Sequence, residues 1–250
     1  MSSRRKSPLD LKPIEPHMCS VELRLEILSH VPFFAGLSEP AISDINQHFI
    51  ERGFTAGETI YFAGDPAMCL YVVADGKIKL LRHSWSGKDV LLDLLTTGEF
   101  FGSLSTLEDD YYPDTAQAQT AACVLSIGSE DFRAILDNYP QAALKILDIT
   151  AERLKSAHET IRQLSAFPVE KRIAHTLLKL GEKIGQKEPV GLLIQVPLSR
   201  DDLAEMTGTT TETASRIMSQ FQKVGLVESG RQWVAIKDQN RLAAILGDKN

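Results

Sequence analysis

Cysteine is scarce in this sequence. The 250 residues include three cysteines, Cys19, Cys69 and Cys123, which lie far apart and form no C-x-x-C pair. This distribution excludes a compact run of cysteine ligands for a metal ion or an iron–sulfur cluster. The odd number also argues against a disulfide framework. We therefore expect free thiols, with Cys69 and Cys123 buried in apolar strand patterns and Cys19 in a loop.

Long apolar runs are also missing. Runs such as LYVVA at 70–74 and VLLDLL at 90–95 have the length of core strands and fall well short of a membrane span. The basic N-terminus, MSSRRKSPLDLKP, lacks the apolar segment of a secretory signal. The sequence therefore predicts a cytoplasmic protein that has no membrane partner.

Two motifs of common enzymes are absent as well. The sequence has no Gly-rich phosphate loop with its lysine and no recognisable pair of nucleophile and base. We therefore expect that the protein is not an enzyme.

Charge is unevenly distributed along the chain. The net charge is −6, yet from Pro168 onward 12 Lys and Arg face 10 Asp and Glu, whereas the preceding part has 15 against 23. Two charge regimes suggest two domains, and only the second suits a phosphate backbone.

The chain separates into four segments. Residues 1–20, with three prolines and a basic start, predict a flexible leader. Residues 21–138 begin with two helical patterns and continue, between 54 and 127, as short β-rich runs separated by glycines, typical of an antiparallel barrel or sandwich. Residues 139–167 predict a long helix and a hinge at its end, and residues 168–250 predict a second domain. A cupin enzyme would show the same β rhythm, but it would need clustered metal ligands that these strands lack.

The long helix carries an apolar seam on one face. Its positions alternate in steps of four and three residues, as in a dimerising helix, and charged residues flank them. Packing on the helix's own β domain is the alternative and is expected at its inner end. The predicted dimer seam consists of Leu147, Thr150, Leu154, Ala157, Ile161 and Leu164.

The stretch Ser199–Val224 predicts two short helices around a tight turn. Ser199 is a capping residue, Gly208 ends the first helix, and Thr210 caps the second. In the second helix Ala214, Ile217, Met218, Phe221 and Val224 define a buried stripe. The opposite face begins with Thr211, Glu212, Ser215 and Arg216, where a helix in the major groove meets base edges. Two short strand-like runs around Ser229-Gly230-Arg231 then predict a β-hairpin wing, so DNA binding is the favoured interpretation.

From Phe33 to Ile236 the chain resembles the catabolite-activator/FNR (CRP/FNR) superfamily of bacterial transcription regulators. The helix-turn-helix and the glycine ladder with Gly64-Asp65 and Tyr71 carry this resemblance. It implies an α+β fold with an N-terminal cyclic-nucleotide-binding-like β-roll, a long dimerisation helix and a C-terminal winged helix-turn-helix. It further implies a homodimer that regulates transcription, as an activator in many relatives, together with RNA polymerase.

The resemblance also places an effector pocket, and the residues in it depart from the family pattern. Ser103 stands where nucleotide binders have Glu, and Asp114 stands where an Arg pairs with the phosphate. A carboxylate there repels a phosphate, so cyclic AMP or GMP is not expected as the ligand. On the long helix, Ala157 and His158 replace the hydroxyl residues that meet adenine. The full expected pocket is Gly102, Ser103, Leu104, Ser105, Asp114, Thr115, Arg153, Ala157 and His158.

Several effectors stay open. The cluster cysteines of the FNR type are missing, which argues against an iron–sulfur sensor. A haem would need a ligand such as His83 or His158, although a surface imidazole is the favoured interpretation of each. A small molecule, a haem-bound gas, a redox thiol or no effector at all are the remaining alternatives. An enzyme or scaffold with a cyclic-nucleotide-type domain is a more distant one.

The recognition helix matches the family motif Glu-x-x-Ser-Arg at Glu212, Ser215 and Arg216. Relatives with this motif read TTGA-type half-sites in an inverted repeat. Arginine can bind guanine in a bidentate manner, Glu can accept from cytosine, and Ser can meet thymine. An ion pair between Glu212 and Arg216, four positions apart, is the alternative. The resemblance further suggests phosphate contacts from Arg200, Thr210 and Thr213.

Overall fold

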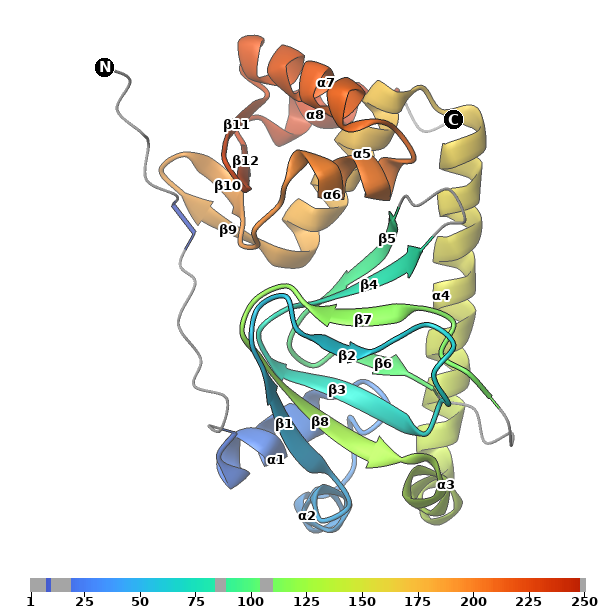
Figure 1. Cartoon of the computed structure of the whole chain (residues 1–250). Coiled ribbons are helices and arrows are strands. Elements are labelled where there is room, and N and C mark those ends of the chain that lie inside the picture. The colour runs from blue at the N-terminus through green and yellow to red at the C-terminus, as the bar shows by residue number, and fades with distance from the viewer. Residues whose placement is uncertain (1–7, 10–18, 84–88, 104–109, 248–250) are drawn as a thin grey trace. The chain divides into compact units, whose positions relative to one another are not determined.

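The computed structural model describes residues 8–9, 19–83, 89–103 and 110–247. The chain divides into two compact units (Figure 1). We call residues 13–87 and 92–157 the β-roll unit, and residues 158–250, with 1–12 and 88–91, the C-terminal unit. No helix in the described ranges is long and apolar enough to cross a membrane.

The β-roll unit is built from two four-stranded sheets. One has the order β1 (Ile50–Phe54), β8 (Ala122–Gly128), β3 (Cys69–Asp75) and β6 (Phe100–Gly102). The other has the order β2 (Thr59–Tyr61), β7 (Thr115–Ala118), β4 (Ile78–His83) and β5 (Asp89–Leu95). The registers of the pairs β1–β8, β8–β3, β3–β6, β2–β7 and β7–β4 are all antiparallel, as the β-rich runs predict. The antiparallel β domain expected from the sequence is therefore confirmed.

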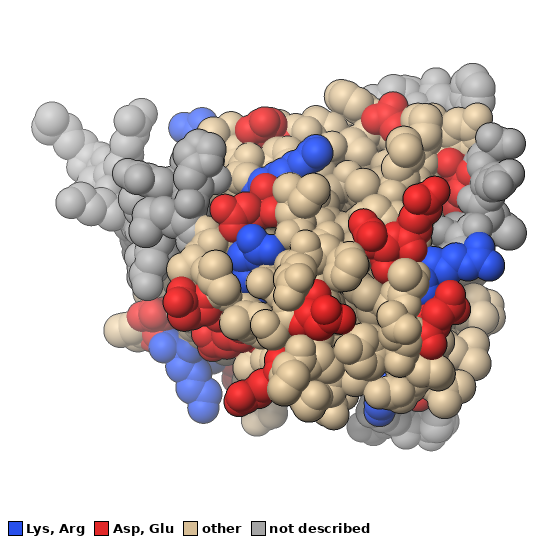
Figure 2. Space-filling model, turned by 90° about the horizontal axis from the view of Figure 1, so that it is seen from below, with Lys and Arg blue, Asp and Glu red and all other residues tan. Residues whose placement is uncertain are grey.

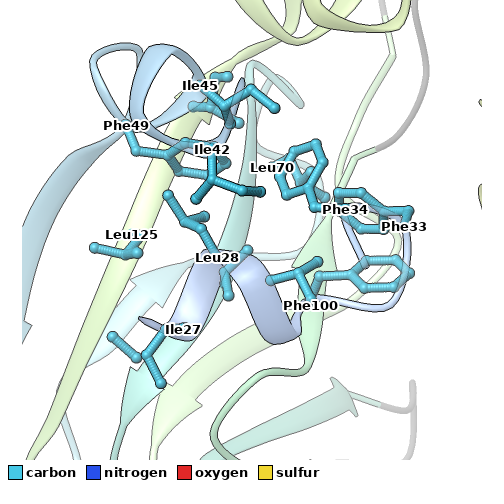
Figure 3. Close-up of a cluster of buried hydrophobic side chains, with 14 of the residues drawn as sticks. Ile27, Leu28, Phe33, Phe34, Ile42, Ile45, Phe49, Leu70, Phe100 and Leu125 are labelled. Carbon is cyan, nitrogen blue, oxygen red and sulfur yellow. The ribbon is translucent and has the colours of Figure 1, made fainter. Parts of the chain in front are cut away.

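Helices cover the first sheet. α1 (Val21–His30) and α2 (Glu39–Asn46) precede the strands, and α3 (Ser129–Asn138) and α4 (Pro140–Ala166) follow them. Apolar side chains of α1, α2 and the turn between them pack on Leu70, Phe100 and Leu125 of the sheet (Figure 3). Helix α3 is an addition to the sequence-based expectation, in which the long helix directly followed the strands. On the face that carries α1, α2 and α3, acidic side chains predominate (Figure 2), in keeping with the charge of this part of the sequence.

The expectation that all three cysteines are free thiols is wrong. The structure joins Cys19 and Cys123 in a disulfide bond across 104 positions, and both side chains are buried. Cys69 is the free cysteine, and it is partly exposed instead of buried. An odd count leaves one thiol unpaired but does not prevent the other two from meeting, and their sequence spacing carries no signal for that contact.

The C-terminal unit combines a helical layer with a small sheet. Its helices are α5 (Val169–Ile184), α6 (Arg200–Thr207), α7 (Thr211–Lys223) and α8 (Gln239–Ala244). The sheet has the order β11 (Val227–Gly230), β12 (Trp233–Ile236), β10 (Gly191–Ile194) and β9 (Gly185–Glu188). The β11–β12 hairpin is the predicted wing. The β9–β10 hairpin precedes α6 and supplies the other two strands of this sheet.

Candidate nucleic-acid interface and effector region

Local signals set the helix-turn-helix. The Ser199 hydroxyl accepts a hydrogen bond from the Asp202 amide, and the Asp202 carboxylate accepts from the Ser199 amide, which is a complete capping box. Gly208 ends α6 with φ +58°, a left-handed conformation that glycine adopts at low cost. Thr210 then caps α7, because its Oγ1 accepts from the Thr213 amide at 3.2 Å.

The buried stripe of α7 fixes which face is free. Ala214, Ile217, Met218 and Phe221 are each at most 3% exposed, as the helical spacing predicts. Val224, which the spacing also placed in the stripe, is 53% exposed. It is the C-cap of α7, and the helical geometry that would turn it inward ends at Lys223.

The opposite face of α7 carries the predicted base-contacting residues. Thr211, Glu212 and Arg216 are exposed and Ser215 is half-buried. The Thr211 hydroxyl donates to the Asp201 carboxylate of α6 at 2.5 Å. Among the described residues, the Glu212 and Arg216 side chains form no hydrogen bond or ion pair, including the alternative i, i+4 pair with each other. Both side chains therefore remain available to a partner.

The predicted phosphate-contacting residues have internal partners. Arg200 Nη2 donates to Ser229 Oγ of the wing at 2.7 Å, and burial lowers the pKa of its guanidinium. The Thr210 hydroxyl also donates to Thr213 Oγ1 at 3.0 Å. Arg200 thus braces the start of α6 against the wing, on the side where DNA contacts are expected.

The predicted dimer seam is an exposed apolar stripe on α4. Leu147, Leu154, Ile161 and Leu164 are 65%, 56%, 60% and 43% exposed, and Thr150 and Ala157 are exposed as well. The inner side of the same helix is buried on the β-roll core through Ala142, Ile146 and Ile149. An apolar stripe of this size is costly in water unless another surface covers it.

The long helix is interrupted where the proline predicts it. Helix α4 ends at Ala166 and α5 begins at Val169. Between them, the ring of Phe167 faces the guanidinium of Arg162 at 5.1 Å and the ammonium of Lys171 at 5.9 Å. These cation–π contacts hold the connection between the two helices.

Part of the expected effector pocket lies beside an aromatic cluster in the β-roll. The four rings of Tyr61, Tyr71, Phe101 and Tyr112 are all buried. Tyr61 stacks on Tyr112 with centroids 3.8 Å apart, and Tyr71 stacks on Phe101 at 5.2 Å. Tyr61 and Tyr112 could not be identified from the sequence, because their contacts across the roll reveal them and their spacing does not.

The polar pocket residues are tied to this cluster. Tyr61 donates its hydroxyl proton to Asp114 Oδ1 at 3.0 Å. Burial raises the pKa of Asp114, although the bond from Tyr61 and the charge of Arg82 oppose that shift. Thr115 is buried and its Oγ1 accepts from the Ala63 amide.

Gly102 and Ser103 lie at the edge of the same cluster. Gly102 has φ +89°, and a Cβ there would come within 2.7 Å of the Cys69 carbonyl and 2.9 Å of the Tyr71 ring. Ser103 binds the Cys69 carbonyl through its amide and Asp110 through its hydroxyl. Leu104 and Ser105 lie outside the described residues.

The remaining expected pocket residues are on α4. Arg153 Nη2 donates to the Phe100 carbonyl at 2.9 Å, and its guanidinium lies 4.0 Å from the centre of the Phe100 ring. Ala157 and His158 are exposed, and so is His83 on β4. Among the described residues, no group of three or more His, Cys, Asp or Glu side chains could hold a metal ion.

Two family models match the chain. The cyclic nucleotide-binding domain matches residues 51–139, and the Crp-like helix-turn-helix domain matches residues 171–245. Together with the exposed polar face of α7, these matches define a class: a DNA-binding transcription regulator with a β-roll of the cyclic-nucleotide-binding type.

Relatives among characterised proteins identify the family. The cyclic AMP receptor protein of Thermus thermophilus is 30% identical over 214 residues, covering 86% of this chain and 96% of that protein. The "Probable transcriptional regulator flp" of Lacticaseibacillus casei is 32% identical over 206 residues, which cover 81% of this chain and 90% of that protein. The structure of FixK2 from Bradyrhizobium japonicum shares the fold, with a TM-score of 0.71, 23% identity and coverage of 81% and 99%. The chain belongs to the CRP/FNR superfamily of transcription regulators.

Proposed function

We propose that this regulator works as a cytoplasmic homodimer that binds a TTGA-type inverted repeat, acts with RNA polymerase as an activator, and responds to an effector other than a cyclic nucleotide. The observation that carries the DNA part is the exposed face at the start of α7. Glu212 and Arg216 lie one helical turn apart there, and their side chains have no partner among the described residues.

The chemistry of these side chains fits such a half-site. The Arg216 guanidinium has the donor geometry for O6 and N7 of guanine, and Glu212 can accept from the amino group of cytosine. Ser215 lies between them and can meet thymine. The N-terminal half of α7 thus offers two groups that fit the G·C pair of TTGA and one that fits its thymines.

A gel-shift assay with a TTGAT-N4-ATCAA duplex tests the specificity. Each good base contact contributes about 1–3 kcal/mol of discrimination, so Arg216→Ala should weaken binding about 5- to 150-fold. The loss should disappear on a duplex in which the guanines of both half-sites are replaced. Lys223→Ala is the matched control, because it removes the same charge from an exposed position at the other end of α7. Equal losses for the two variants, or a wild type that does not prefer the palindrome, would refute the half-site.

The seam on α4 supports the homodimer. Two copies that bury this stripe against each other would form a dimer with two α7 helices, which suits two half-sites about 34 Å apart, one turn of DNA. An effector could then act by changing the seam and the Phe167-Pro168 hinge. A symmetric dimer would contact two half-sites in opposite orientations, and this is the reason for proposing an inverted repeat.

The effector part rests on the aromatic cluster. The four stacked rings occupy the β-roll interior, and Asp114 is held by Tyr61 instead of being free for a ligand. An Asp carboxylate at this position repels a phosphate. Calorimetric titration with cyclic AMP and cyclic GMP should therefore show no binding, and a saturable isotherm with either would refute this part. A Soret band in the visible spectrum of the purified protein would establish haem, for which His83 and His158, both exposed, are the candidate ligands.

A further inference from the structure

The disulfide between Cys19 and Cys123 joins two parts of the β-roll unit that have different anchoring. Cys123 lies inside β8, which pairs with Gly53 of β1 on one side and Asp75 of β3 on the other. Cys19 lies just before Ser20, the N-cap of α1. The Cα atoms are 6.8 Å apart, and the side chains are 6% and 4% exposed. The bond therefore ties the entry of α1 to a strand fixed on both edges.

The packing around this bond continues to α4. Cys19 and Cys123 belong to the same apolar core as Phe33 and Phe100, and Ala142 of α4 is buried in it as well. Ile146 and Ile149 of α4 pack on that core. Phe100, in addition, holds Arg153 through its carbonyl and its ring. A change in how α1 sits on this core consequently reaches the helix whose outer face carries the exposed seam.

We propose that Cys19 and Cys123 form a reversible redox site and that its state regulates DNA binding through α4. A small disulfide such as oxidised glutathione can act as the oxidant. One protein thiolate attacks it, releases a glutathione thiolate and forms a mixed disulfide. The second protein thiolate then attacks the protein sulfur of that mixed disulfide and releases the other glutathione, so two protein thiols become one disulfide as one glutathione disulfide becomes two thiols.

Anchoring decides which cysteine moves during reduction. Cys123 is held by β pairing on both sides, whereas Cys19 lies outside the helix that follows it. Reduction should free Cys19 and the entry of α1 and leave β8 in place. A disulfide in a reducing compartment is commonly transient or redox-sensing, and that fits the cytoplasmic location on which this inference rests.

Cys69 is a control that the chain itself provides. It is the free cysteine of the structure and is partly exposed on β3. Cys69→Ser removes a thiol without touching the proposed site. Cys19→Ser and Cys123→Ser each remove one half of it, and the double variant removes both.

The first test equilibrates the full-length protein in glutathione buffers from fully reduced to largely oxidised, quenches thiol exchange with acid, and then labels the free thiols of the unfolded protein with iodoacetamide for peptide mass analysis. Labelling of Cys19 and Cys123 should fall together as the buffer becomes oxidising, and that of Cys69 should not follow. In the Cys19→Ser variant, Cys123 has no partner thiol, so iodoacetamide should label it to the same extent in the unfolded protein whichever glutathione buffer was used. Independent labelling of the two cysteines, or full labelling throughout, would overturn the redox site.

The second test compares DNA affinity of the reduced and oxidised forms on the TTGAT-N4-ATCAA duplex and on an unrelated duplex of equal length at low salt. Couplings between sites typically change affinity about 5- to 150-fold, and a difference in that range is expected in the wild type and in Cys69→Ser. It should vanish in Cys19→Ser and Cys123→Ser, whose folding is checked by circular dichroism. Equal affinities of the two wild-type forms on whichever duplex binds would overturn the regulatory role. If the two forms differ in affinity but neither prefers the palindrome over the unrelated duplex, only the proposed half-site is refuted.

Discussion

Truncation of Leu154 is the sharpest test of the dimer. Leu154 lies in the middle of the α4 seam and is 56% exposed in the single chain. Full burial of a leucine side chain contributes about 1.5–3 kcal/mol, so covering the exposed half contributes about 0.8–1.7 kcal/mol per protomer. A symmetric dimer buries the residue twice. Leu154→Ala should therefore cost about 1.5–3 kcal/mol of association free energy, a dimer dissociation constant about 10- to 150-fold higher.

Sedimentation equilibrium over a range of protein concentrations measures that constant directly. Val21→Ala is the matched control, because Val21 is also an apolar helical residue and is also 56% exposed, but lies on α1. Leu154→Asp should raise the dimer dissociation constant more than Leu154→Ala does. It should also weaken binding to the palindrome more than binding to a single half-site, because only the palindrome engages both protomers. If Leu154→Ala and Val21→Ala leave the constant equally unchanged while helix content is retained, the seam is not the dimer interface.

Three further substitutions probe the folded units. Burial raises the pKa of Asp114 above 3.8, so the folded state gains stability as this group is protonated and loses it as pH rises through the folded pKa. Asp114→Asn keeps an acceptor for the Tyr61 hydroxyl, so it should raise the melting temperature at pH 7 and lose that advantage below pH 3.8. Equal melting curves of the variant and the wild type at pH 7 would contradict this. Thr210→Ala removes the cap of α7 and should cost the C-terminal unit about 0.5–2 kcal/mol in urea unfolding, whereas an unchanged midpoint would show that the cap is dispensable. Gly102→Ala places a Cβ 2.7 Å from a carbonyl of β3 at φ +89° and should destabilise the β-roll by more than about 1 kcal/mol, which a normal melting temperature would disprove.

Features set by neighbouring residues could be predicted from the sequence. The caps at Ser199 and Thr210 and the turn at Gly208 each depend on residues within a few positions. The exposed seam of α4 follows from helical periodicity alone. For the same reason the free polar face of α7 was predictable, since its buried stripe fixes where the remaining side chains point.

Contacts between distant segments could not be predicted in this way. The resemblance identifies Asp114 as a carboxylate at the position where relatives have an arginine. It does not identify the hydrogen-bond partner of Asp114, because Tyr61 lies 53 positions earlier in the sequence. Cys19 and Cys123 are separated by a whole set of strands, and neither belongs to a motif. Tertiary packing decides such pairs, and a single sequence gives spacing without packing.

The two candidate inputs to this regulator meet at one element. Phe100 is the first residue of β6, which ends at Gly102 at the edge of the aromatic cluster, and its carbonyl and ring hold Arg153 of α4. In the proposed redox switch, the disulfide would act on the same α4 through the core against which Ile146 and Ile149 pack. A β-roll whose interior is filled by its own aromatic rings has less need of a ligand to order it than a hollow one. The thiol pair is then the part of this unit that can change state without displacing that packing, and this makes it the stronger candidate for the input.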